Sequence, residues 1–215
     1  ENTISGTSVN DISGNGNTGT LTNGPTKTIG KIGQAINLDG TNDYMSSART
    51  LTGTTNTISE WIYPLRFGLN NNLNGIFYQG TASNDTGTRF AVGICTGCSV
   101  TGGGDTNTLF FENEAGTTYL TAANNAIVLN TWQHVAIVKN GANEWLYING
   151  ILQSSRTNGN TTAPTNNNSY IGFWYSSSDA NRFFQGKVDD VRVYNGKALS
   201  PDEIKRLYRI GASTK

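Results

Sequence analysis

Charge and ionisable side chains are scarce in this sequence, and their scarcity excludes several kinds of function. The 215 residues include 15 basic and 15 acidic side chains and one histidine, so the net charge at pH 7 is zero. Nucleic-acid binding requires a clustered basic face, and we therefore expect no nucleic-acid partner. No apolar run approaches the ~18 residues that a transmembrane helix needs, and we expect no membrane insertion.

Cysteine is equally scarce, because Cys95 and Cys98 are the only two in the chain. With His134 as the single histidine, this pair cannot complete a four-ligand zinc site. The surrounding residues predict strand and loop, whereas a thioredoxin-like motif opens a helix. We predict a structural disulfide between Cys95 and Cys98 that fixes a turn. The alternative is two inert thiols.

Short apolar segments separated by polar clusters make up most of the chain. Segments rich in aromatic and β-branched residues are bounded by Gly and Asn, which is the pattern of strands and turns. The dipeptide Asn140-Gly141 between two of these segments predicts a tight hairpin. At this length the strands fit one domain, so we predict an all-β fold made of a two-sheet antiparallel sandwich. The predicted strands are 58–64, 75–79, 89–94, 108–112, 132–139 and 144–148.

One short helix is predicted near the C-terminus. Ser200 is placed to cap it, Pro201 takes the first helical position, and Glu203 completes a capping box. Ile204 and Leu207 then supply an apolar stripe at helical spacing. We therefore expect a single C-terminal helix in an otherwise all-β domain.

Six motifs follow one another in an order typical of one domain family. They are Asp-Ile-Ser-Gly-Asn-Gly-Asn at 11–17, Gly-Gln-Ala-Ile-Asn-Leu-Asp-Gly at 33–40, Ser-Glu-Trp at 59–61, Thr-Trp-Gln-His-Val-Ala at 131–136, Leu-Tyr-Ile-Asn-Gly at 146–150 and Gly-Lys-Val-Asp-Asp-Val at 186–191. In this order the chain resembles the LamG-like, concanavalin A-like jelly-roll domains of bacterial extracellular proteins. The resemblance implies a jelly roll of two curved antiparallel sheets, with residues 1–215 forming one domain. The family usually begins with an aromatic-rich strand that this sequence mostly lacks, so we expect a fragment of a larger protein.

The resemblance also carries expectations about function. Members of the family commonly bind carbohydrate or protein partners outside the cell. We therefore expect a carbohydrate-binding or adhesive module of a secreted protein, located extracellularly or at the cell surface, with a glycan or a surface protein as its partner. The alternative is a structural surface domain that makes protein–protein contacts in a filament, a phage tail or a cell envelope.

Members of the family often hold a calcium ion, and the first and last strands of related jelly rolls lie side by side. That neighbourhood would bring Asp11 close to Asp189 and Asp190, and calcium prefers about six to eight oxygen ligands. Strict strand alternation directs only one of the two adjacent acids at the loop unless a bulge intervenes, and we favour Asp190. The alternative is that these acids bond to loop amides, or pair with Arg192 or Lys187, without an ion. The predicted ligands of this structural calcium are Asp11, Asn15, Gly16, Asn17, Asp189 and Asp190.

The sequence offers no recognisable set of catalytic groups. Glycoside hydrolases need two carboxylates that flank the scissile bond. The nearest approach is Glu112-Asn113-Glu114, which we interpret as a strand edge facing solvent. His134 has no evident orienting acid or nucleophile, and we expect it to pack structurally. We therefore predict that the protein is not an enzyme.

A ligand-binding surface is predicted where aromatic and polar residues gather between strands. Sugar sites combine aromatic platforms for ring faces with polar groups for hydroxyls. The stretch 173–182 has this composition, and the loop 79–89 adds polar side chains. The alternative is that its aromatic residues Trp174 and Tyr175 pack beneath neighbouring loops. The predicted ligand-binding residues are Trp174, Tyr175, Asp179, Asn181, Asn84, Asp85 and Arg89.

Overall fold

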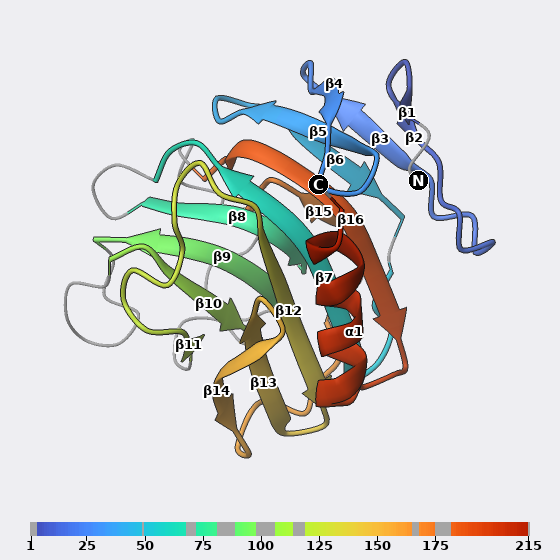
Figure 1. Cartoon of the computed structure of the whole chain (residues 1–215). Helices are drawn as coiled ribbons and strands as arrows, with labels where there is room; N and C mark the ends of the chain where they lie inside the picture. Colours follow the sequence, from blue (N-terminus) through green and yellow to red (C-terminus); the bar gives the residue numbers. More distant parts are fainter. Residues whose placement is uncertain are drawn as a thin grey trace.

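Two antiparallel β-sheets pack face to face, and one helix lies against the outside of one of them (Figure 1). The structure is a computed structural model that describes residues 4–48, 50–67, 72–80, 89–97, 106–113, 119–164, 168–174 and 182–214. The predicted all-β jelly-roll sandwich with one short C-terminal helix is confirmed.

Among the described residues, nine strands form the first sheet in the order β1, β2, β3, β6, β15, β8, β9, β10 and β11. Their bounds are Ile4–Ser5 (β1), Ser8–Val9 (β2), Gly19–Thr22 (β3), Tyr44–Ser47 (β6), Ser169–Ile171 (β15), Asn72–Gln79 (β8), Phe90–Thr96 (β9), Thr108–Glu112 (β10) and Tyr119–Thr121 (β11). We call this the nine-stranded sheet.

The second, or seven-stranded, sheet has the order β14, β13, β12, β7, β16, β5 and β4 over the same described ranges. Its bounds are Ile151–Arg156 (β14), Asn143–Ile148 (β13), Gln133–Asn140 (β12), Thr55–Pro64 (β7), Gln185–Asn195 (β16), Gln34–Asp39 (β5) and Thr26–Ile29 (β4). β16, the last strand of the chain as described, lies between β7 and β5, so it joins segments that are distant in sequence.

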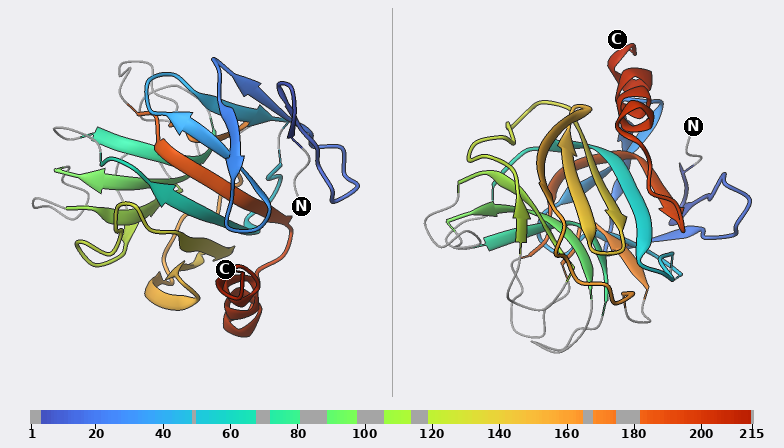
Figure 2. Two further views of the ribbon diagram at one scale, coloured as in Figure 1. Left: turned by 45° about the horizontal axis from the view of Figure 1, so that its top comes forward. Right: turned by 90° about the horizontal axis from the view of Figure 1, so that it is seen from below.

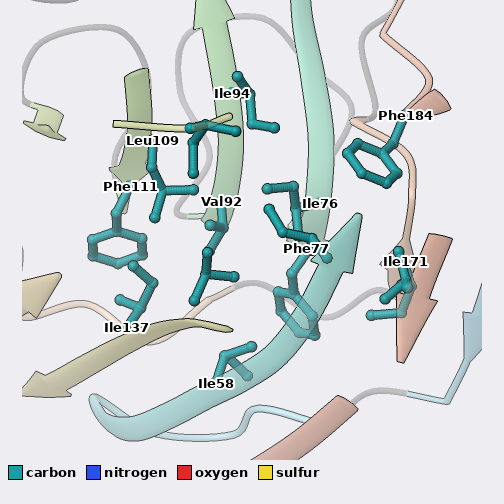
Figure 3. Packing of buried hydrophobic residues seen from close by; sticks show 14 of the residues in the cluster. Ile58, Ile76, Phe77, Val92, Ile94, Leu109, Phe111, Ile137, Ile171 and Phe184 are labelled. Atoms are coloured by element: carbon teal, nitrogen blue, oxygen red, sulfur yellow. The ribbon is translucent and has the colours of Figure 1, made fainter. Parts of the chain in front are cut away.

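The main core lies between the two sheets (Figure 3). Phe77 and Val92 enter it from the nine-stranded sheet, and Ile58 and Ile137 enter it from the seven-stranded sheet, each at most 2% exposed. Strands alternate their side chains between two faces, so other residues of the same strands point outward. Smaller buried clusters therefore lie on the outer face of each sheet.

The helix α1 (Pro201–Ala212) covers part of the outer face of the seven-stranded sheet (Figure 2). Its N-terminus has the predicted capping box, in which Ser200 Oγ accepts from the Glu203 amide and the Glu203 carboxylate accepts from the Ser200 amide. Ile204 and Leu207 are buried against residues of β12 and β13. The predicted helix, its cap and its apolar stripe are confirmed.

The predicted hairpin is formed by β12 and β13. Asn140 pairs with Asn143, and Gly141 in the turn has a φ of 60°. Glycine adopts this left-handed conformation without the steric cost that a side chain brings. The Asn140-Gly141 signal therefore predicted the hairpin at the right position.

β16 contains a bulge at Asp190. Its register against β7 shifts between Asp189 and Arg192, and Asp190 has a φ of 48°. Val188 before the bulge and Val193 after it both pack in the main core, although their separation would place them on opposite faces of a regular strand. The extra residue restores the apolar face, so strict alternation does not hold in β16.

Candidate binding sites

A row of side chains crosses the outer face of the nine-stranded sheet. Tyr170 of β15 pairs with Tyr78 of β8, Tyr78 with Ala91 of β9, Ala91 with Glu112 of β10, and Glu112 with Tyr119 of β11. Paired residues on neighbouring strands project to the same face. Three of these five residues are tyrosines, so the row places aromatic rings outside the main core.

These rings belong to a longer aromatic band in which each ring contacts the next. The centroid distances are 4.8 Å for Phe183–Phe173, 5.4 Å for Phe173–Tyr44, 5.9 Å for Tyr44–Tyr170, 6.5 Å for Tyr170–Tyr78, 5.7 Å for Tyr78–Trp174, 5.4 Å for Trp174–Phe110 and 5.9 Å for Phe110–Tyr119. We call these eight residues the aromatic band. Its centre, at Tyr78, Trp174 and Phe110, is at most 1% exposed, and its other rings are half-buried.

One glycine of β8 allows the band to form. A Cβ at Gly75 would lie 2.3 Å from the Trp174 backbone nitrogen, so only glycine lets the chain at Trp174 lie directly on this strand. The Gly75 amide donates to the Arg182 carbonyl (3.1 Å), and Phe173 pairs with Phe183 across the same short ladder. Both described ends of the predicted 173–182 loop are therefore anchored on β8.

An ion pair lies at the centre of the band. The Arg89 guanidinium pairs with the Glu112 carboxylate and lies 5.6 Å from the centre of the Trp174 ring. The Arg89 side chain is 14% exposed and that of Glu112 only 1%. Arg89 Nε and Trp174 Nε1 are buried donors with no hydrogen-bond partner in the described structure. Such donors are costly to bury.

The predicted ligand-binding residues are thus placed only in part. Trp174 and Arg89 contact each other on the outer face, as a shared site requires. The Trp174 side chain is 1% exposed, which agrees with the alternative that it packs beneath other groups. Its role as an open platform for a sugar ring stays a prediction. The other predicted ligand-binding residues lie outside the described residues, namely Tyr175, Asp179, Asn181, Asn84 and Asp85.

Sequence reasoning missed most of the aromatic band. Tyr44 and Tyr170 lie in separate strands that the pairing of β6, β15 and β8 brings together, and Phe183 joins them through its bridge to Phe173. A usable signal was present in β8 and β10, where aromatic residues occupy consecutive positions and hence both faces of the strand.

A cleft of about 890 Å³ is the second candidate site. It lies between the segment 9–19 and the C-terminal half of β16. Five of the six predicted calcium ligands line it, namely Asp11, Asn15, Asn17, Asp189 and Asp190. The Asp11 loop and the acids of β16 therefore line one cleft, although β1 and β16 are not neighbours in the described structure, because β1 belongs to the nine-stranded sheet and β16 to the seven-stranded sheet.

The carboxylates in this cleft already have hydrogen-bond partners. Asp11 accepts from the amides of Ser13 and Asn17, both at 2.8 Å, and bonds from these residues lower its pKa. Both oxygens of Asp190 accept from Arg192 Nε, at 3.0 and 2.9 Å. These are the contacts given above as the alternative to an ion.

Asp189 is occupied by backbone amides. Its Oδ2 accepts from Ile32 (2.6 Å) and its Oδ1 from Asp190 (2.7 Å), while burial raises its pKa. Among the described residues, no group of three or more His, Cys, Asp or Glu side chains is arranged to hold a metal ion. A calcium ion does not fit these donors unless the Asp190–Arg192 pair opens first, and calcium binding stays a prediction.

His134 and Glu112, the two residues considered above for catalysis, are both buried and paired with other side chains. His134 is 1% exposed beneath α1, its Nε2 lies 2.8 Å from Ser59 Oγ, and burial lowers its pKa to about 4. It packs structurally, as expected. The expectation that Glu112 faces solvent is wrong, because the ion pair with Arg89 lets this carboxylate be buried. Glu114 lies outside the described residues.

Cys95 is fully buried and disulfide-bonded. It lies on the outer face of the nine-stranded sheet, in the cluster that contains Tyr78 and Trp174. Its predicted partner, Cys98, lies outside the described residues. The half-cystine therefore belongs to the wall of the aromatic band and to no reactive centre that we describe.

A jelly-roll sandwich of this kind is the architecture of many lectin domains. The chain belongs to the concanavalin A-like lectin/glucanase superfamily, whose family model matches residues 39–205. A comparison with curated protein sequences finds no match. No helix in the described ranges is long and apolar enough to cross a membrane.

Several solved domains have a similar fold. One of them is domain 4 of AbnA, an extracellular arabinanase from Geobacillus stearothermophilus, and this domain was solved in complex with arabinotriose. It is 21% identical to this chain with a TM-score of 0.69, and the match covers 92% of this chain and 91% of that one. The binding domain of Paraclostridial Mosquitocidal Protein 1 is 16% identical (TM-score 0.70; 95% and 50% covered), and that of botulinum neurotoxin serotype G is 18% identical (TM-score 0.70; 95% and 49% covered). The chain spans about half the length of these two toxin domains. At these identities the likeness shows the fold alone.

Proposed function

We propose that the protein is a non-catalytic carbohydrate-binding module of a secreted or surface protein, and that a glycan binds along the aromatic band. The observation that carries this proposal is the half-exposed end of the band, where Tyr44, Tyr170, Phe173 and Phe183 contact one another. The apolar face of a sugar ring packs on such side chains, and nearby polar groups bond its hydroxyls.

The centre of the band supports the same proposal. Arg89 Nε and Trp174 Nε1 are enclosed donors without a described acceptor, so a sugar oxygen reaches them only when the side chains above them move aside. Placing both donors among aromatic rings is unfavourable for the free protein. A ligand that accepts from them would recover part of that free energy.

The proposal excludes glycoside hydrolysis by the described part of this face. Hydrolysis needs two carboxylates that exchange protons or attack the sugar. Glu112 is the carboxylate in the row, and its pairing with Arg89 keeps it as an ion-pair partner beneath the surface. Recognition without cleavage is therefore the function that we propose.

Glycan-array binding followed by calorimetry with the best glycan tests the proposal, with arabinotriose as the first single probe. Tyr44→Ala and Phe173→Ala each remove one half-exposed ring, whose contact contributes roughly 1 kcal/mol, so we expect affinity to fall about fivefold. Tyr63→Ala is the matched control, because Tyr63 is a half-buried aromatic residue on the other sheet. Absence of glycan binding, or equal affinity in all three variants, would reject the proposal.

Trp174→Phe separates the role of the unpaired donor from that of the ring. The substitution keeps an aromatic side chain in the buried centre and removes Nε1, which has no described acceptor. We expect glycan affinity to fall while the melting temperature changes little. A variant that binds as tightly as wild type would show that Nε1 takes no part.

The alternative function, a structural domain that makes protein contacts, is favoured by one observation. β14 is an edge strand on which Ile151 is 66% and Leu152 is 49% exposed. Exposed apolar edges favour association with another chain. Concentration-dependent association lost in Ile151→Lys, together with no glycan binding, would favour this alternative.

A further inference from the structure

Three buried charged side chains lie in a row across the inner face of the seven-stranded sheet. Lys139 of β12 lies opposite Glu144 of β13, and Glu144 lies opposite Arg156 of β14. Ile137 and Leu146, two residues away from Lys139 and Glu144 on the same strands, belong to the main core. Residues two apart on a strand share a face, so the row points toward the nine-stranded sheet.

Asn113 meets this row from the nine-stranded sheet. It comes directly after β10, two residues beyond Phe111 of the main core. Asn113 Nδ2 donates to Glu144 Oε1, and Arg156 Nη2 donates to Asn113 Oδ1 (3.2 Å). We call Asn113, Lys139, Glu144 and Arg156 the Lys139 cluster, and every member is at most 9% exposed.

One oxygen of Glu144 holds an amine and an amide next to each other. Lys139 Nζ donates to Glu144 Oε1 (3.2 Å), the same atom that accepts from Asn113 Nδ2. Two donors on one acceptor lie within ~6 Å of each other, so a rotation of the lysine side chain brings its nitrogen to the ~3–3.5 Å from which it attacks a carbonyl carbon. Because both polar atoms of the Asn113 amide are held, its carbon keeps one orientation.

The charges of the Lys139 cluster do not balance. Lys139 and Arg156 both form their described ion pairs with Glu144, so two cations share one carboxylate. An unpaired buried charge is costly. Burial lowers the pKa of Lys139, although Glu144 opposes the shift. The neutral amine that results from loss of the proton is a nucleophile, whereas the ammonium is not.

We propose that Lys139 and Asn113 react to form an intramolecular amide bond, which ties β12 to the end of β10 and thus joins the two sheets covalently. The amine of Lys139 replaces the amide nitrogen of Asn113, and that nitrogen leaves as ammonium. The reaction consumes no oxidant, reductant or other molecule.

Each step uses a contact described above. Glu144 takes a proton from the Lys139 ammonium, and the neutral Nζ attacks Asn113 Cγ while Arg156 Nη2 stabilises the negative charge on Oδ1. Glu144 then gives its proton to Nδ2 and takes a second one from Nζ. The Cγ–Nδ2 bond breaks, and ammonia leaves with that second proton as ammonium. The new amide is neutral, so the Glu144 carboxylate and the Arg156 guanidinium now balance.

The intact mass of the reduced, denatured protein tests the proposal without any substitution. We expect a mass lower than that of the sequence by one ammonia molecule. Asn-Gly steps can also lose ammonia, so tandem mass spectrometry of a tryptic digest locates the change. We expect the peptides that contain Lys139 and Asn113 to be joined, with the chain uncut after Lys139. A mass equal to that of the sequence, or an ammonia loss located at an Asn-Gly step without the joined peptides, would overturn the proposal.

Two variants test the roles of the reacting groups. Lys139→Arg keeps the positive charge but lacks the amine, and Glu144→Gln keeps a hydrogen-bonding side chain that cannot take the proton. Both should have the unmodified mass of their sequences, and tryptophan fluorescence checks that they fold. Lys205→Arg, at an exposed position of α1, is the matched control and should still lose ammonia. Joined peptides in Glu144→Gln, or the same ammonia loss in Lys139→Arg, would overturn the proposal. If either variant fails to fold, the joined peptides of wild type decide the question.

Discussion

Replacing Glu60 with glutamine is expected to stabilise the protein at neutral pH and to leave its stability almost unchanged in acid. Glu60 lies on β7 between Ile58 and Ile62, both of which face the main core, so its carboxyl group faces the core as well. The residue is 1% exposed, and neither carboxyl oxygen has a described hydrogen-bond partner. Burial raises its pKa from 4.5 to about 8.

The sign of the effect follows from this pKa. Between pH 4.5 and 8 the folded protein holds a proton on Glu60 that the unfolded chain releases, so stability is greatest below pH 4.5 and falls as the pH rises toward 8. Each pH unit costs about 1.4 kcal/mol, and the 2.5 units between 4.5 and 7 give roughly 3 kcal/mol at pH 7. Glutamine is neutral at every pH and has a similar size, so the variant should gain that amount at pH 7.

Urea unfolding followed by tryptophan fluorescence, at pH values from 4.5 to 8, measures the difference between Glu60→Gln and wild type. We expect the free energies of unfolding to coincide near pH 4.5 and to separate steadily as the pH rises. A difference that does not change with pH over this range would refute the reasoning, because it would mean that Glu60 has no raised pKa in the folded protein. An unchanged slope of free energy against urea concentration checks that the unfolded states are comparable.

Three further predictions concern other parts of the fold. Gly211→Ala should lower the free energy of unfolding by roughly 1–3 kcal/mol, because a Cβ there would lie 2.5 Å from the Trp61 ring. Gly53→Ala is the control and should be nearly neutral, because a Cβ there would have no atom within 4 Å. Equal effects of the two substitutions in urea unfolding would contradict this prediction. His134 has a pKa lowered to about 4, so its protonation in the unfolded chain should reduce stability as the pH falls from 6.5 to 4, and this slope should disappear in His134→Gln. A calcium ion at the Asp11 loop would raise the melting temperature of wild type but not of Asp11→Asn, and a melting temperature unaffected by both calcium and EDTA would reject the ion.

Local signals were sufficient for several elements. The Asn140-Gly141 turn and the Ser200 capping box depend on residues that are neighbours in sequence, and both occur where the sequence predicts them. The short strands were found because strand alternation is itself a local pattern. Family membership follows from the same information, since the motifs lie in order along the chain.

Residues whose surroundings come from distant segments could not be placed in this way. Glu112 was expected to face solvent, yet Arg89, 23 positions away, makes its burial possible. Trp174 is buried by contacts with Tyr78 and Phe110 from two other strands. A bulge at Asp190 changes which residues of β16 face the core, and nothing in the Val-Asp-Asp-Val sequence by itself specifies it.

The sequence by itself determined that this protein is an all-β sandwich of the concanavalin A-like superfamily with a capped C-terminal helix, because alternation, turn residues and caps act over a few residues. Only the tertiary structure decided the position of the aromatic band and the bulge in β16. Both depend on strands that pair across the chain, with β15 joining β6 to β8 and β16 joining β7 to β5. The physical reason is that side chains far apart in sequence share a surface only after the sheets have formed and packed.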